Sequence, residues 1–427
     1  MSLPKYPAYK DSEVEWLDAI PSHWSIAPLK RLLDIQNGAD HKAVEVEEGI
    51  SVIGSGGPFA FASEYLYDGE SVLLGRKGTI DKPLYVSGKF WTVDTMYWSK
   101  VLPDTCGKYA YYAATTIPFS FYSTNTALPS MTKGALSAHL IARPPLAEQA
   151  VIATFLDRET GKIDRLIAEQ EKLIALLVEK RQATISHAVT RGLDPAAPMK
   201  DSGVEWLGQV PAYWCVARVK AASLFTTSGP RGWSERITED GSLFIQSGDL
   251  NDALGLEYET AKRVNVGDDS EAARTRLSEG DVVVCITGAK TGNVAFCSSL
   301  HERAYVNQHL CLIRPTNEVK GRFLAFALKS TMGQLQLELS QYGLKQGLSL
   351  ENVREVWVTY PPCDEQEAVI AFLDAEMNKF TLLTQAANAA VNLLKERRAA
   401  LIAAAVTGQI DVRGLVDAPA SAAPEAA

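Results

Sequence analysis

Residues 10–30 read KDSEVEWLDAIPSHWSIAPLK, and residues 200–220 read KDSGVEWLGQVPAYWCVARVK. The two stretches align without a gap when Lys10 is placed on Lys200, and about half of their positions are identical. Both have an acidic start, a proline and two tryptophans at the same places, so that Trp16 matches Trp206 and Trp24 matches Trp214. Similarity at a fixed offset indicates an internal repeat, so the chain consists of two related halves.

A second repeated pair lies further along each half. Residues 144–194 open with PPLAEQAVIATFLD and close with LLVEKRQATISHAVTRGLD, while residues 361–411 open with PPCDEQEAVIAFLD and close with LLKERRAALIAAAVTGQID. Pro144 matches Pro361, which is a larger offset than that between Lys10 and Lys200, so the second half has the longer middle. The middles also share a weak match, because Ile53-Gly-Ser-Gly resembles Ile245-Gln-Ser-Gly. The order along the chain is variable domain, shared helix, variable domain, shared helix.

The shared segments have the spacing of long amphipathic helices. Apolar residues recur at intervals of one or two helical turns, at Ile152, Leu156, Ile163, Leu166, Leu173 and Leu177 in the first copy and at Ile370, Leu373, Met377, Phe380, Leu383, Val391 and Leu394 in the second. Helices of about 40 residues extend roughly 60 Å, which is more than a small domain can cover. We expect them to pack on each other as an antiparallel coiled coil about a pseudo-twofold axis. Two separate surface helices remain the alternative.

The middles, residues 26–143 and 216–360, have short β-rich runs punctuated by glycine. These runs are residues 71–74, 90–98, 281–286 and 304–313, with helical patterns at 108–115 and 320–330. We therefore predict an α/β (α+β) fold in two tandem domains of ordinary size. The predicted division is 1–145 and 196–362 for the domains, 146–195 and 363–412 for the helical segments, and 413–427 for a disordered, small-residue tail.

A glycine-containing polar loop follows a buried-looking strand in each middle. Gly75-Arg-Lys-Gly-Thr follows SVLL, and Thr287-Gly-Ala-Lys-Thr-Gly follows VVVC. Small residues let the backbone approach a phosphate, and Arg, Lys and Thr supply hydrogen-bond donors to phosphates or to guanine edges. The candidate DNA contacts are Ser55, Arg76, Lys77, Thr79, Lys133, Arg231, Ser247, Thr287, Lys290, Thr291, Lys345 and Gln346. A solvated turn is the alternative for either loop.

The composition limits the classes of function. The net charge of −9 and the pI of about 5.4 argue against DNA binding over the whole surface, although binding depends on local potential. The six cysteines form no C-x-x-C pair, and neither they nor the six histidines have metal-ligand spacing, so we expect free thiols in a reducing cytoplasm and no metal. No apolar run is long enough for a membrane helix, and the first residues are unlike a secretory signal.

Motifs of catalysis are absent from the sequence. GAKTGN at 288–293 lacks the second glycine of a phosphate-binding loop, because Ala289 stands in its place. RPPL and YPPC lack the residues with which adenine methyltransferases hold a flipped base, so we expect a structural role for them. There is no G-x-S-x-G or H-E-x-x-H motif. We therefore predict a non-catalytic protein without a cofactor.

Three recurring features together resemble the specificity subunit of type I restriction–modification systems. They are PP-x-x-EQ before a long helix, W-L-x-x-(I/V)-P-x-x-W at the start of each half, and Ala-Val-Thr near each helix end. The resemblance covers nearly the whole chain apart from its tail, and its motifs lie in the repeats rather than in the middles.

The resemblance implies a role in DNA recognition. Each middle would be a target-recognition domain for one half of a split double-stranded DNA target. The helical segments would space the two domains and dock two modification subunits, which carry S-adenosylmethionine and adenine methyltransferase activity. Motor-nuclease restriction subunits that consume ATP would complete the complex.

Two other functions compete with this hypothesis. One is a methyltransferase or nuclease fused to recognition domains, which would need a complete catalytic motif. The other is a coiled-coil scaffold without nucleic-acid function, whose middles would not retain DNA when the partner subunits are present.

Overall fold

The computed structural model describes residues 3–122, 130–267, 269–342 and 347–416. The chain forms two compact units, one made of Met1–Glu171 with Ala389–Ala427 and the other of Lys172–Asn388. We describe each unit by itself. Lys345, Gln346 and most of the predicted tail lie outside the described residues.

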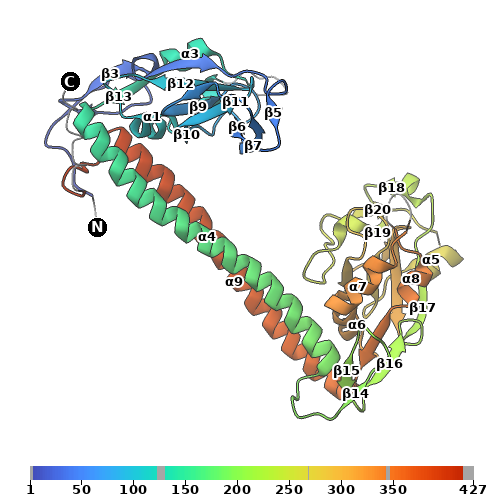
Figure 1. Ribbon diagram of the computed structural model, residues 1–427. Coiled ribbons are helices and arrows are strands. Elements are labelled where there is room, and N and C mark those ends of the chain that lie inside the picture. The colour runs from blue at the N-terminus through green and yellow to red at the C-terminus, as the bar shows by residue number, and fades with distance from the viewer. Residues whose placement is uncertain (1–2, 123–129, 268, 343–346, 417–427) are drawn as a thin grey trace. The chain divides into compact units, whose positions relative to one another are not determined.

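The two long helices of the sequence are present and continuous. Helix α4 spans Leu146–Arg191 and helix α9 spans Cys363–Val406, and Figure 1 shows them side by side. The start of α4 shares the core of the first unit with the end of α9, and the end of α4 shares the core of the second unit with the start of α9. The helices therefore pack antiparallel, as the apolar stripes predict.

Each unit contains a four-stranded antiparallel sheet with the same strand order. In the first unit the order is β10 (Leu84–Val86), β9 (Ser71–Gly75), β12 (Met96–Val101) and β4 (Leu33–Asn37). In the second unit it is β22 (Val294–Phe296), β21 (Val282–Cys285), β24 (Leu310–Pro315) and β17 (Ser223–Ser228). Strands with only weakly similar sequences thus occupy matching places in the two middles.

A second, mixed sheet also recurs in both units. The first unit has β5 (Glu45–Val46), β7 (Gly57–Ala62), β6 (Ile50–Gly54), β11 (Lys89–Thr92) and β8 (Tyr67–Asp68), in that order. The second unit has β18 (Ile237–Thr238), β20 (Lys262–Val264), β19 (Ser242–Ile245) and β23 (Ala304–Val306). One strand pair in each sheet is parallel, β6 with β11 and β19 with β23. This shared topology confirms that the middles have one fold.

Short helices and two-stranded ribbons complete the units (Figure 1). The ribbons pair β1 (Tyr9–Lys10) with β2 (Ile20–Pro21), β3 (Ser25–Pro28) with β13 (Leu140–Arg143), β14 (Met199–Asp201) with β15 (Gln209–Pro211), and β16 (Cys215–Arg218) with β25 (Trp357–Tyr360). The helices are α1 (Gly107–Ala114), α2 (Phe119–Tyr122), α3 (Lys133–Ala138), α5 (Ser270–Thr275), α6 (Gly321–Lys329), α7 (Thr331–Leu339) and α8 (Leu350–Arg354). Helix α1 packs on β9 and β10, and α6 packs on β21 and β22.

Two β-rich runs of the sequence each divide into two strands. Residues 90–98 supply β11 and β12, and residues 304–313 supply β23 and β24. In both cases the chain leaves the mixed sheet and enters the antiparallel sheet after a short turn. Uniform β propensity conceals such a change of sheet, because it does not specify the partner strand.

The PP-x-x-EQ motif joins each long helix to its domain. The Gln149 side chain accepts a hydrogen bond from the N–H of Cys106, at 3.0 Å, and donates one to the carbonyl oxygen of Pro144, at 3.0 Å. Gln366 does the same with Lys320 and Pro361, both at 2.8 Å. Cys106 and Lys320 precede α1 and α6, whose first N–H groups need acceptors. Both motifs therefore have a structural role.

The glutamate of the same motif binds the opening repeat of each half. Glu148 lies 2.9 Å from the Nε2 atom of His23, and Glu365 accepts a hydrogen bond from Tyr213 at 3.1 Å. His23 and Tyr213 match in the gapless alignment of the two opening repeats, so one packing contact uses two different side chains.

Part of the extra length of the second half lies between two strands. In the first unit, β6 and β7 are joined by the two-residue turn Ser55–Gly56. In the second unit, the matching strands β19 and β20 are joined by residues 246–261. We call residues 246–261 the inserted segment.

Candidate nucleic-acid interface

In the first unit, the loops after β4, β9 and β11 meet at one edge of the sheets. β4 and β9 both run antiparallel to β12, so their carboxyl ends lie on the same side. The main-chain N–H groups of Arg76 and Lys77 donate to the carbonyl oxygen of Thr95, at 2.9 and 3.1 Å. A Cβ atom at Gly38 would lie 2.0 Å from the carbonyl oxygen of Val93, so only glycine allows this close approach.

The second unit has the same edge. The N–H of Ile286 donates to the carbonyl oxygen of His309 at 2.9 Å, as Arg76 does to Thr95. A Cβ atom at Gly229, directly after β17, would lie 2.0 Å from the carbonyl oxygen of Val306. We call this region the loop edge of each unit. It comprises residues 38–41, 55–56, 76–80, 93–95 and 130–133 in the first unit and 229–232, 246–249, 286–292, 307–309 and 347–349 in the second.

Backbone pairing aligns the two loop edges residue by residue. Lys77 forms an isolated β-bridge with Ser130, and Thr287 forms one with Gly347. Position 77 therefore corresponds to position 287 and not to Lys290. Lys290 lies three residues further along its loop than Thr287, so the two lysines named by the sequence occupy different places.

The first loop edge brings together three basic candidates. Arg76 is half-buried, donates to the carbonyl oxygen of Asp94 at 3.2 Å, and has its guanidinium 5.9 Å from the centre of the Tyr97 ring. Lys77 is exposed, and its ammonium has no hydrogen bond or ion pair among the described residues. Lys133 is the first residue of α3, which follows the bridge partner of Lys77 closely in the chain.

The remaining candidates of the first unit lie apart from these three. Ser55 is in the β6–β7 turn, and Thr79 is exposed in the middle of the loop after β9. Neither side chain makes a hydrogen bond to another candidate within the described part of the chain. The structure thus places both on the loop edge without joining them to the basic group.

In the second unit, two of the candidates are already bonded within the protein. The ammonium of Lys290 donates to the carbonyl oxygens of Gly248 and Leu250, at 3.0 and 2.9 Å. The hydroxyl of Thr291 donates to the carbonyl oxygen of Gly288 at 2.7 Å. These hydrogen bonds shape the loop and reduce the donors that face solvent.

The other three described candidates of the second unit flank this loop. Thr287 is half-buried, and Arg231 is exposed two residues after the close approach of Gly229. Ser247 is half-buried and begins a short 3-10 helix, Ser247–Asp249, next to the carbonyl groups that Lys290 binds. Lys345 and Gln346 lie outside the described residues.

Sequence reasoning missed the polar turn between β23 and β24. Asn307, Gln308 and His309 lie on the loop edge, where the side chain of Asn307 accepts the N–H of His309 at 3.0 Å. Amide and imidazole groups are able to recognise base edges by hydrogen bonding. The sequence did not reveal this turn because residues 304–313 were predicted as one continuous β-rich run. Three adjacent polar residues inside an apolar run were the available clue.

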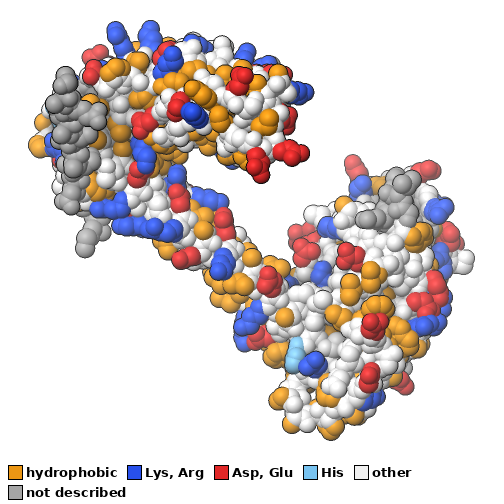
Figure 2. Space-filling model, in the orientation of Figure 1, with side chains coloured by type: hydrophobic (Ala, Val, Ile, Leu, Met, Phe, Trp, Pro, Cys, Tyr) orange, Lys and Arg blue, Asp and Glu red, His pale blue; other side chains and the backbone are white. Residues whose placement is uncertain are grey.

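Many basic side chains away from the loop edge are neutralised within their own unit. Figure 2 shows Lys and Arg interspersed with Asp and Glu over the visible face. Arg322 makes a bidentate ion pair with Asp374, with the shortest distance 2.6 Å, and Arg263 pairs in the same way with Glu302. Such pairs leave little net potential for a phosphate, so an acidic total charge is compatible with local basic sites.

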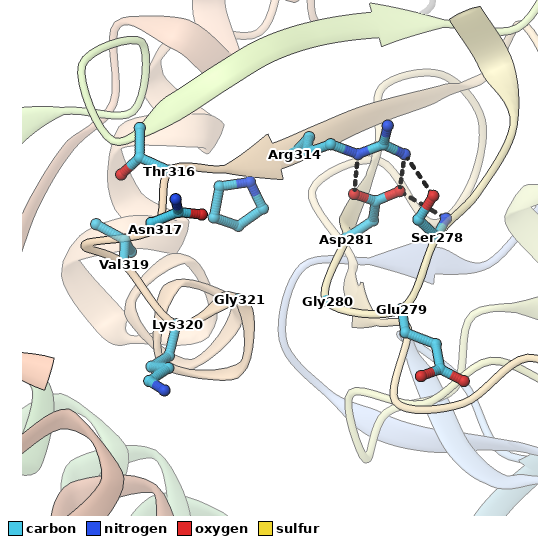
Figure 3. A pocket seen from close by; sticks show the side chains of 11 residues that line it. Ser278, Glu279, Gly280, Asp281, Arg314, Thr316, Asn317, Val319, Lys320 and Gly321 are labelled. Atoms are coloured by element: carbon cyan, nitrogen blue, oxygen red, sulfur yellow. Dashed lines mark hydrogen bonds and ion pairs between the residues drawn. The ribbon is translucent and has the colours of Figure 1, made fainter. Parts of the chain in front are cut away.

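An open pocket of about 430 Å³ at the opposite end of β21 has an ion pair in its wall. Figure 3 shows the Arg314 guanidinium facing the Asp281 carboxylate and the Ser278 hydroxyl. The Nε and Nη2 atoms of Arg314 lie 2.8 and 2.7 Å from the two carboxylate oxygens. The buried carboxylate holds the pKa of Arg314 above its usual value. This ion pair connects the start of β21 to β24. The Arg314 guanidinium is therefore already bound by Asp281.

The described residues offer neither a metal site nor a membrane-spanning helix. No group of three or more His, Cys, Asp or Glu side chains in the described ranges is placed to hold a metal ion. None of the described helices has the length and apolarity needed to cross a membrane.

Comparison with known proteins agrees with the duplicated architecture. A family model described as the type I restriction modification DNA specificity domain matches residues 21–175 and 236–393. The specificity subunit of the type I restriction enzyme EcoBI of Escherichia coli is 21% identical over 450 residues, covering 96% of this chain and 91% of that protein. The EcoKI specificity subunit of strain K12 is 21% identical over 295 residues, covering 65% of this chain and 59% of that protein.

Two solved structures have a similar fold. A chain from a type I R-M system, solved in a study of complex assembly and conformational transition, has a TM-score of 0.69 at 15% identity and covers 91% of this chain and 98% of its own. The HsdS subunit from Thermoanaerobacter tengcongensis has a TM-score of 0.50 at 15% identity, with coverages of 92% and 98%. Because the family model matches more than half of the residues, in two copies, the chain belongs to the type I restriction–modification DNA specificity subunits.

Proposed function

We propose that this chain reads a split double-stranded DNA target, with one half-site recognised by each middle domain. Family membership makes it a specificity subunit, which directs DNA target recognition within a larger complex and is itself non-catalytic. The observation that carries the proposal is the recurrence of one loop edge, with the same backbone register, on two domains of different surface sequence. One fold with divergent loops is what two readers of different half-sites require.

The proposal assigns reading and spacing to different parts of the chain. Residues 1–145 and 196–362 would recognise DNA, and residues 146–195 and 363–412 would set the gap between the half-sites. Two readers on one spacer gain affinity because binding of the first raises the effective concentration of the second. Continuous helices of 46 and 44 residues support a spacer of defined length.

Direct DNA contact is proposed for the candidates of the two loop edges. Arg76, Lys77 and Lys133 would contact phosphates or guanine in the first half-site, with Ser55 and Thr79 beside them. Thr287, Arg231, Ser247 and Thr291 would line the second site. Lys345 and Gln346 remain sequence-based candidates.

The partners of the complex follow from the family and belong to the proposal. Two modification subunits would dock on the helical segments and supply S-adenosylmethionine chemistry, and restriction subunits would join through the complex. Exposed leucines on the helices, such as Leu173 and Leu393, support a docking surface. The scattered free cysteines support a reducing, cytoplasmic location.

The proposal is tested by mapping methylated adenines genome-wide in cells that carry this chain with its modification subunit. We expect new methylation in a split motif with a constant gap. The strain without the chain is the control. New methylation in an uninterrupted motif, or none at all with both proteins present, would count against the proposal.

Lys77→Met tests the first loop edge. Because Lys77 is exposed and without a partner in the described ranges, losing its charge should weaken DNA binding by the assembled complex. Each phosphate contact contributes about 0.9 to the slope of log K against log salt concentration, so the slope should fall by roughly that amount. Binding isotherms at several salt concentrations measure both quantities. Unchanged affinity and slope would remove Lys77 from the interface.

A further inference from the structure

The inserted segment of the second domain is a compact loop with its own internal bonds. The side-chain oxygen of Asn251 accepts the N–H groups of Ala253 and Gly255, at 3.0 and 2.7 Å. The N–H of Asn251 donates to the carbonyl oxygen of Gly255, and that of Glu257 to Asp249, at 3.1 and 2.8 Å. An asparagine that binds the backbone ahead of it stabilises a turn, so this segment has a defined shape.

The inserted segment is anchored to the body of the second unit. Leu254 has a φ angle of 63°, in the left-handed region that is unfavourable for leucine. Its side chain is only 3% exposed and belongs to the core shared with α6 and the long helices, and its carbonyl oxygen accepts the N–H of Phe296 at 2.9 Å. A backbone held in this region persists only where the surrounding contacts fix it.

Lys290 connects the loop after β21 to this anchored segment. Its ammonium donates to the carbonyl oxygens of Gly248 and Leu250, while the Asn293 side chain donates to Leu250 at 3.4 Å. The buried carboxylate of Asp249 lies close to the same ammonium, and burial raises the pKa of that carboxyl. The positive charge of Lys290 is therefore already stabilised by oxygen atoms of the protein.

The described part of the first domain has no counterpart to this connection. Its strands β6 and β7 are joined by two residues, so they carry no insertion that could support the loop after β9. Lys77, the basic residue of that loop, has no side-chain partner within the described ranges. Lys77 and Lys290 lie in similar loops of the sequence. In the described structure the Lys290 ammonium is hydrogen-bonded within the protein and the Lys77 ammonium is not.

We propose that Lys290 is a positioning residue for target recognition. It fixes the loop of residues 287–292 against the inserted segment and so holds Thr287, Gly288 and Ala289 at the loop edge, instead of neutralising a DNA phosphate. The proposal rests on the proposed function of the second domain as a reader. It also implies that the inserted segment acts as a rigid support for that half-site alone.

The two roles predict different binding signatures. A phosphate contact is independent of sequence, so its loss weakens all targets alike and reduces the salt slope. A positioning role depends on the shape of the loop, so its loss reduces discrimination between correct and altered bases of one half-site. It leaves the number of neutralised phosphates, and hence the salt slope, unchanged.

The first experiment compares Lys290→Met with Lys77→Met in the assembled complex. The probes are a duplex with the mapped split target and duplexes with single-base changes in either half. For Lys290→Met we expect discrimination in the second half-site to fall several-fold, with the first half-site and the salt slope unchanged. A slope lowered by about 0.9, with discrimination intact, would show a phosphate contact and overturn the proposal.

The second experiment needs no DNA and separates this proposal from the function of the domain. Amide hydrogen exchange is measured on the full-length chain alone. The N–H of Gly292 donates to the carbonyl oxygen of Cys285 and that of Asn293 to Lys290, so Lys290→Met should accelerate exchange there and in residues 248–255, and Lys77→Met should not. Methionine keeps the aliphatic stem, which favours a folded variant. Unchanged exchange in a folded Lys290→Met chain would contradict the proposal, even if the domain binds DNA.

Discussion

Gln149 and Gln366 show how one side chain joins three parts of a unit. Each glutamine binds the residue before a domain helix and the first proline of its own motif. Gln366 also donates to the carbonyl oxygen of Glu318 at 2.8 Å and is fully buried. A buried amide with all these partners specifies the angle between domain and helix, because an unpaired buried group is costly.

Gln366→Ala should destabilise the second unit. It leaves the N–H of Lys320 and the carbonyl group of the buried Pro361 without the amide that binds both, at about 1–3 kcal/mol for each such group, so we expect a loss of about 3 kcal/mol in the free energy of unfolding. Urea denaturation followed by circular dichroism measures this. Glu367→Gln, which removes an exposed ion pair with Lys320, is the control and should change little. Equal effects of the two variants would contradict this account.

His139 gives the first unit a pH dependence. Burial lowers the pKa of its imidazole from 6.5 to about 4, and the ring stacks on Trp16 at 4.9 Å with its Nδ1 atom 2.7 Å from the Tyr122 hydroxyl. Between pH 6.5 and about 4, His139 is protonated in the unfolded chain and neutral in the folded chain. Above pH 6.5 the imidazole is neutral in both states and does not affect stability. As the pH falls from 6.5 towards 4, protonation of the unfolded chain lowers the free energy of unfolding.

His139→Val should remove this pH dependence. Valine occupies the matching position in the second half, at Val356, which is also buried. We expect the stability advantage of the parent chain over the variant to shrink as the pH falls from 7 to 4. Denaturation curves at a series of pH values measure the difference. A constant difference across that range would show that His139 does not titrate as described.

At the scale of elements, the paired helices repeat their attachments as well as their lengths. Lys108 of α1 pairs with Asp157 of α4, and Arg322 of α6 pairs with Asp374 of α9. The two aspartates match in the alignment of the helical repeats, in which each ends the run FLD. Each domain is thus fixed to the start of the helix that follows it by the same type of ion pair.

A matched insertion in both helices should change the gap and not the half-site sequences. Seven residues are nearly two turns of helix, so the apolar stripe continues on the same face, and they add about 10.5 Å. Inserted between residues 171 and 172 and between 388 and 389, they should lengthen the gap by about three base pairs of 3.4 Å. Methylation mapping measures the outcome. An unchanged gap would show that the helices do not set it.

Inserting the heptad into α4 alone is the control for that experiment. One long and one short helix cannot keep both ends of the antiparallel pair in register. We therefore expect loss of site-specific methylation in this variant, with both half-sites affected.

At the scale of the whole molecule, each unit is completed by a helix end from the other half of the sequence. Gly192, with φ 74° after α4, packs on Trp214, and Gly408, with φ 77° after α9, packs on Trp24. The N–H of Asp411 donates to the carbonyl oxygen of Pro4 at 2.8 Å. The residues that follow α9 thus contact the opening repeat of the first half, as Gly192 after α4 contacts that of the second half.

Exchange of the two middles should reverse the order of the half-sites. The matching strand orders and the shared helix attachments make residues 26–143 and 216–360 interchangeable in position. The exchanged chain should direct methylation to the same two half-sequences in the opposite order. Methylation mapping in the exchanged strain measures this, and the parent strain is the control. Retention of the original order would show that recognition is not confined to the middles.

The sequence alone determined the features that depend on local pattern. The two repeated pairs, each at its own fixed offset, established the duplication, and three- and four-residue spacing established both long helices. Side-chain periodicity along one helix needs no distant partner to be recognised. The apolar run at residues 71–74 and the two polar loops were also recognised from neighbouring residues alone.

Only the tertiary structure decided which loops meet and which side chains are already bonded. It divided residues 90–98 and 304–313 between two sheets, and it placed Lys77 in solvent and Lys290 against the inserted segment. These outcomes depend on hydrogen bonds between residues far apart in the chain. The spacing of residue types along the sequence contains no information about such partners. Two lysines in similar loops therefore read alike in the sequence and differ in the fold.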